Sequence, residues 1–83
     1  MNRTDALDMV RESISSVIPD ADADVAALAP DDRFREVLEM DSLDFLSFVE
    51  VLSERSGIRI EDEDTPRLTT LSGSADFLVT RMQ

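Results

Sequence analysis

The sequence from Asp41 to Gly57, DSLDFLSFVEVLSERSG, has the start, the period and the end of an amphipathic helix. Asp41 is a good N-cap residue, and Asp44 follows it at the spacing of a loose capping box. Gly57 can adopt the left-handed conformation that often ends a helix. At about 100° per residue, four apolar side chains fall on the face expected to meet the core: Phe45, Phe48, Val49 and Leu52.

The flanking sequence predicts two more long helices. In the first, Thr4 or Asp5 would be the N-cap, and Pro19 would stop the helix. Its core face is predicted by apolar residues spaced three and four apart: Leu7, Val10, Ile14 and Val17. In the last, one of the two threonines at 69–70 would be the N-cap, and Gly73 would weaken the helix. Its inner face is expected to contain Leu71, Ala75, Leu78 and Met82.

The connections between these helices carry weaker patterns. Residues 20–30 are expected to form a loop that Val25 and Leu28 anchor to the core. A short helical turn should follow, because three apolar residues share one helical face: Phe34, Val37 and Leu38. Beyond Gly57, residues 58–60 are expected to be a short extended segment, followed by an acidic turn. This turn is expected to open a short helix that Pro66 interrupts, and Leu68 should anchor the following segment to the core. The predicted fold is all-α: a small four-helix bundle of three main helices and a short third helix, with a long first loop, in one domain over residues 1–83.

Charge narrows the classes of partner. The 83 residues include 19 Asp and Glu against 8 Arg, with no Lys, for a net charge of -11. Such a field repels phosphate backbones and disfavours binding to nucleic acid. It attracts basic patches on other proteins.

The residue types that the sequence lacks exclude several kinds of catalytic and metal site. There is no His and no Cys, which excludes a Ser-His-Asp hydrolase, a thiolate nucleophile and a Cys-based zinc site. Two glycines far apart cannot build a phosphate-binding loop, so we do not expect an enzyme. No metal site is expected either, because the EF-hand-like spacing of Asp20, Asp22 and Asp24 has Val25 where the loop needs Gly. No apolar run reaches the length of a membrane span, and a cytoplasmic location is the default expectation.

Asp41-Ser42-Leu43-Asp44 resembles the attachment motif of acyl carrier proteins, the D-S-L sequence at the start of their second helix. The resemblance covers nearly the whole chain. Apolar and threonine positions also fall at the family's usual spacings: Phe34, Leu38, Leu52, Ile60, Leu68, Thr69, Thr70 and Leu71. The resemblance implies a free-standing carrier, with Ser42 next to Asp41 as the cofactor-binding position.

The resemblance also implies the chemistry. A phosphopantetheinyl transferase would move a 4′-phosphopantetheine arm from coenzyme A onto the Ser42 hydroxyl. The arm would then hold acyl groups as thioesters for enzymes of fatty-acid, polyketide or specialised lipid biosynthesis. A phosphodiester at the start of a helix gains from the free N–H groups and the positive end of the helix dipole.

One face of the helix after Ser42 is expected to be the docking face for partner enzymes with basic patches. It consists of Leu43, Asp44, Leu46, Ser47, Glu50 and Glu54. Apolar residues surrounded by acids are a usual interface layout. The alternative is a solvated face with two incidental leucines.

Some positions depart from the family pattern. Glu39 replaces a common glycine before the motif, Ser56 a buried aromatic and Glu61 a frequent proline, which favours a specialised carrier. Two alternatives stay open: a stand-alone peptidyl or aminoacyl carrier, and an unmodified acidic helical adaptor in which Ser42 only caps a helix. In every case the chain is expected to be a monomer.

Overall fold

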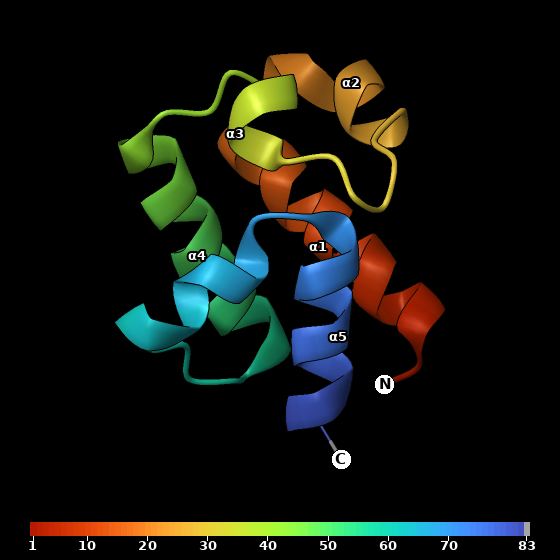
Figure 1. Ribbon diagram of the computed structural model, residues 1–83, viewed down its shortest axis with the longest axis vertical. Coiled ribbons are helices and arrows are strands. Elements are labelled where there is room, and N and C mark those ends of the chain that lie inside the picture. The colour runs from red at the N-terminus through yellow and green to blue at the C-terminus, as the bar shows by residue number, and fades with distance from the viewer. Residues whose placement is uncertain (83) are drawn as a thin grey trace.

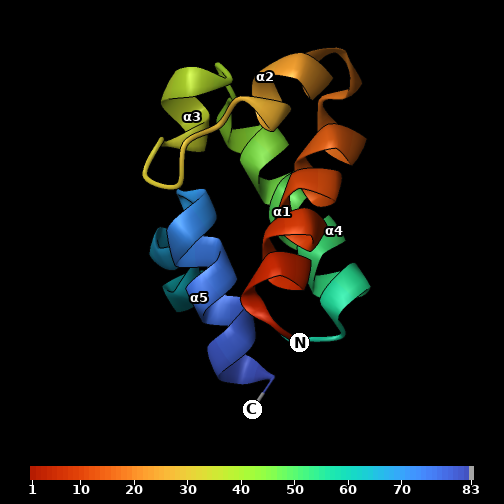
Figure 2. The same ribbon diagram turned by 90° about the vertical axis from the view of Figure 1, so that its right-hand side faces the viewer.

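Helix α1 (Arg3–Val17) packs against both other long helices, α4 (Ser42–Ser56) and α5 (Leu71–Arg81), in the computed structural model, which describes residues 1–82 (Figures 1 and 2). Four shorter elements connect them: the 3-10 helix η1 (Pro19–Ala21), α2 (Asp22–Ala26), α3 (Phe34–Val37) and the 3-10 helix η2 (Asp62–Leu68). The predicted all-α fold is confirmed. Its three main helices are α1, α4 and α5, and the short third helix is η2.

The N-cap residues of α4 and α5 are those predicted from the sequence, and the N-cap of α1 is not. The Asp44 N–H donates to the Asp41 side chain at 2.8 Å, and Thr70 accepts from the Gly73 N–H at 3.0 Å, as predicted. The N-cap of α1 was predicted wrongly, because Asn2 takes that role by accepting from the Asp5 N–H at 2.8 Å. Asn is as good an N-cap as Asp or Thr, so the helix begins two or three residues earlier than predicted.

The first loop contains more helix than predicted. Residues 19–26 form η1 and α2, where a loop was expected. The alanines of this stretch favour a helix, and burial of Val25 and Leu28 holds it against the core, as expected. In α3, Phe34 and Leu38 are buried, but Val37 is 46% exposed. Val37 is the last residue of this four-residue helix, and its side chain is left on the solvent side of the turn.

Two corrections concern the C-terminal third. Pro66 lies inside η2 and does not interrupt it. A 3-10 helix is a series of short turns, so a missing N–H removes one bond without ending the element. Met82 was expected on the inner face of α5 but is 41% exposed, because the helix ends at Arg81.

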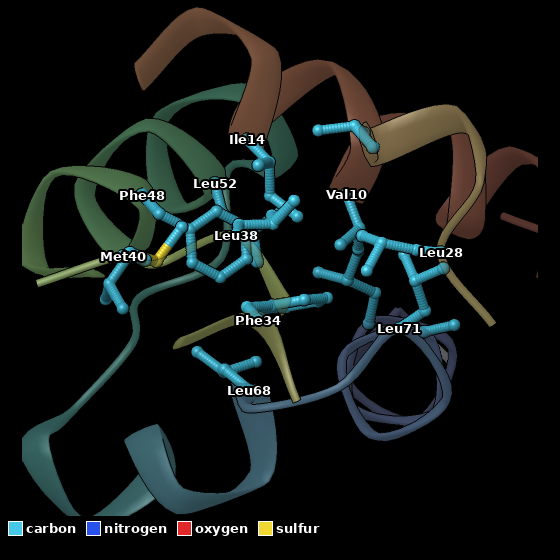
Figure 3. Packing of buried hydrophobic residues seen from close by; sticks show 14 of the residues in the cluster. Val10, Ile14, Leu28, Phe34, Leu38, Met40, Phe48, Leu52, Leu68 and Leu71 are labelled. Carbon is cyan, nitrogen blue, oxygen red and sulfur yellow. The ribbon is translucent and has the colours of Figure 1, made fainter. Parts of the chain in front are cut away.

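Phe34 is the centre of the core near the start of α4 (Figure 3). Its ring meets the Phe48 ring edge to face, with centroids 5.5 Å apart. Such pairs add to the gain from burial. The Phe34 N–H donates to the Thr69 carbonyl at 3.0 Å, and the Ser72 N–H donates to the Pro30 carbonyl at 2.9 Å. These contacts fasten α3 to the start of α5 and hold it beside the N-terminus of α4.

Candidate functional site

Ser42 is the first residue of α4, and its side chain is exposed. Asp41 precedes it with extended backbone and turns its carboxylate back to the Asp44 N–H. The cap uses the Asp41 carboxylate and leaves the Ser42 hydroxyl outside the helix. The hydroxyl therefore stands at the positive end of the α4 dipole, where a phosphate group is favoured.

Arg35, on α3, is a neighbour of Ser42 that the sequence analysis missed. Its Nη2 donates to the Ser42 Oγ at 3.2 Å. Within residues 1–82, no carboxylate lies within ion-pair distance of Arg35, whereas five other arginines pair with acids. No sequence signal identifies this contact, because it depends on how the α3 turn folds back toward α4.

In the segment that leads to Ser42, buried and exposed side chains alternate. Leu38 and Met40 are 8% and 3% exposed, while Glu39 between them is exposed. Glu39 has φ 52°, in the left-handed region that favours glycine. The glutamate therefore keeps the backbone conformation that glycine adopts readily, and the two buried neighbours hold the chain there.

The six residues of the expected docking face lie along one side of α4. Leu43 is 74% exposed and Leu46 is 53% exposed, so both are far more open than core leucines. Ser47, Glu50 and Glu54 are exposed as well, and Asp44 is half-buried. Val37, which the sequence analysis placed in the core, adds a third exposed apolar side chain from the turn that also carries Arg35.

An open hollow of ≈ 480 Å³ lies between α3 and the end of η2. It is lined by Arg33, Arg35, Glu36, Pro66 and Thr69. Phe45 and Phe48 do not line it: Phe48 is buried, and Phe45 is half-buried against the core. Both rings therefore act in packing, as expected.

Comparison with known proteins decides the family. Residues 8–78 match the family described as "Phosphopantetheine attachment site". An acyl carrier protein from Rubrobacter xylanophilus is 32% identical over 79 residues, covering 95% of this chain and 94% of that protein. This chain belongs to the acyl carrier protein family. A second acyl carrier protein, from Thermosynechococcus vestitus, is 30% identical over 78 residues, covering 94% of this chain and 93% of that protein. Polyketide-8 synthase acyl carrier protein 2 from Streptomyces avermitilis is 32% identical over 81 residues, covering 95% of this chain and 90% of that protein.

Membership in the acyl carrier family confirms the resemblance and the phosphopantetheine cofactor. It favours the acyl carrier interpretation over the peptidyl carrier and the unmodified adaptor. A carrier of this family is modified by a transferase and interacts with biosynthetic enzymes. Within residues 1–82, no helix is long and apolar enough to cross a membrane.

The residues present fit the cofactor of the acyl carrier family. An exposed hydroxyl, a helix N-terminus and an arginine that lacks a carboxylate partner in residues 1–82 meet at one point. When bound, phosphopantetheine supplies a thiol that carries acyl groups as thioesters. At the start of α4 the chain presents an exposed hydroxyl in a field that favours a phosphate group.

Proposed function

We propose that Ser42 is the attachment residue and that this chain carries acyl groups without catalysing their reactions. The observation that carries the proposal is the exposed Ser42 hydroxyl at the start of α4, directly after the Asp41 cap. A hydroxyl that capped its own helix would point back at the backbone. Here Asp41 does the capping, which leaves Ser42 available to another enzyme.

The modification needs no activating base from this chain. The Ser42 Oγ forms a new bond to the phosphorus that bears the pantetheine group of coenzyme A. The bond from that phosphorus to the adenosine bisphosphate breaks, and the hydroxyl proton passes to a base of the transferase. The absence of His and Cys is compatible with this division of labour.

The partner enzymes are proposed to bind the docking face of α4 together with Val37. Leu43, Leu46 and Val37 would supply the apolar centre, and Glu50 and Glu54 would face a basic patch on the partner. The name of the Streptomyces avermitilis relative supports partners in polyketide synthesis. Enzymes of fatty-acid and specialised lipid biosynthesis use the same kind of carrier, so the proposal includes them as candidate partners.

The test is the intact mass of the purified chain after incubation with coenzyme A and a promiscuous phosphopantetheinyl transferase. We expect wild type to gain one phosphopantetheine and Ser42→Ala to gain none. Ser16→Ala is the matched control, because Ser16 is also an exposed helical serine but lies on α1, outside the docking face, and it should be modified like wild type. An unmodified wild type beside a carrier that the same transferase does modify would refute the proposal.

A further inference from the structure

Within residues 1–82, three arginines have no carboxylate within ion-pair distance, Arg11, Arg35 and Arg67, and of these only Arg35 donates a hydrogen bond to Ser42. Arg3, Arg33, Arg55, Arg59 and Arg81 each lie within ion-pair distance of a carboxylate. Within residues 1–82, Arg35 has no such partner and instead donates to the Ser42 hydroxyl at 3.2 Å. A guanidinium carries a full charge and five donors, so a neutral hydroxyl leaves most of its binding capacity unused.

The surroundings of Ser42 are otherwise acidic. Asp41 and Asp44 lie within two residues of it, and Glu36 and Glu39 lie in the segment that leads to it. A phosphodiester on Ser42 would add another negative charge to a chain that already has a net charge of -11. Arg35 provides a positive charge at the point where that negative charge would form, and arginine binds phosphate oxygens with two parallel hydrogen bonds.

The fold holds Arg35 in this place. The residue follows Phe34, whose ring is fully buried and whose N–H is bound to the Thr69 carbonyl. The backbone of α3 is therefore anchored beside the start of α4, and only the Arg35 side chain needs to move between the hydroxyl and a phosphate oxygen. Little conformational entropy is lost when so much of the geometry is already fixed.

We propose that Arg35 is a positioning residue that pairs with the phosphodiester formed on Ser42 and fixes the direction in which the arm leaves α4. This rests on the proposed attachment at Ser42. The pair offsets part of the local repulsion and is absent from the unmodified protein, so attachment of the arm tightens the contact between α3 and α4.

The test uses the modified full chain as wild type, Arg35→Gln, Arg35→Lys and Arg33→Gln. Arg33→Gln is the matched control, because Arg33 is also exposed and lines the same hollow but does not contact Ser42. The 31P resonance of the phosphodiester is followed as NaCl rises from about 0.01 M to about 1 M, where screening shortens from about 30 Å to about 3 Å.

We expect the resonance to move with salt in wild type and in Arg33→Gln, and to lose at least half of that movement in Arg35→Gln. Arg35→Lys keeps the charge but not the paired donors, so its response should lie between the two. We also expect attachment of the arm to raise the urea midpoint less in Arg35→Gln than in Arg33→Gln. If all four proteins are modified and their 31P responses agree, Arg35 does not pair with the phosphate, while attachment at Ser42 stands. Failure to modify wild type would instead overturn the attachment itself.

Discussion

Gly73 lies in the first turn of α5, where the backbone of η2 passes close to it. A Cβ added at this position would lie 2.4 Å from the Arg67 carbonyl oxygen and 3.1 Å from the Thr70 Oγ1. Neither atom can retreat freely. The carbonyl belongs to the backbone, and the hydroxyl is the cap that accepts from the Gly73 N–H. The glycine therefore permits the close approach of η2 and α5.

Replacing Gly73 with alanine tests this interpretation. Alanine is about 1 kcal/mol better than glycine inside a helix, but overpacking costs about 1–3 kcal/mol. A contact of 2.4 Å with a backbone atom calls for the upper part of that cost, so Gly73→Ala should lower the free energy of unfolding by up to about 2 kcal/mol in urea titrations. Thr80→Ala is the control, because Thr80 is exposed on the same helix and should gain a few tenths of a kcal/mol. Equal gains in both variants would contradict the close approach.

Asp41, Gly73 and Arg35 show which features local sequence rules can predict and which they cannot. The Asp41 cap was predicted because it depends on two positions three apart in the sequence. Gly73 was interpreted only as a weak helix residue, since its packing depends on Arg67 across a turn. Arg35 gave no signal at all, because its contact with Ser42 follows from the path of α3. Interactions between residues close in sequence can be predicted from the sequence, whereas contacts between separate elements cannot.

At the scale of elements, the long helices could be predicted from local sequence, whereas the short helices depend on contacts with other elements. The long helices α1, α4 and α5 carry several turns of apolar periodicity, so their existence was predicted. Helix α2 has five residues and α3 has four. Segments of that length are not stable alone and form where burial of a few side chains, such as Val25 and Phe34, holds them. Their boundaries were therefore beyond prediction.

The docking face of α4 gives the prediction that belongs to this scale. Replacing both Glu50 and Glu54 with lysine should lower kcat/KM of the transferase for this carrier by about tenfold at low salt, because steering by opposite charge raises association rates by that order. Stability should change little, since both side chains are exposed. The effect should shrink as salt rises.

Asp20 and Asp24 provide the matched control for that charge reversal. Both are exposed, and they lie at the start of the first loop, on η1 and α2. Replacing them with lysine changes the net charge by the same amount as the change on α4. If the two double variants slow the transferase equally, total charge determines the rate and α4 is not a specific docking face.

At the scale of the whole molecule, net charge opposes the packing that holds the helices together. The 19 acids exceed the 8 arginines by 11, and the molecule measures only 32 × 24 × 19 Å. At about 0.01 M salt the screening length is about 30 Å. Every charge then acts on every other charge, and repulsion among the acids is close to its maximum.

The unmodified protein should therefore become more stable as salt rises. The ion pairs of the described residues are mostly exposed and worth little each. Their loss to screening should be smaller than the relief of repulsion. Between about 0.01 M and 0.15 M NaCl, we expect a gain of about 1 kcal/mol, or about 4–8 °C in Tm by circular dichroism. Magnesium chloride at matched ionic strength separates general screening from binding of the cation, since screening alone would give the same Tm. A Tm that falls as NaCl rises would mean that the ion pairs between helices outweigh the repulsion.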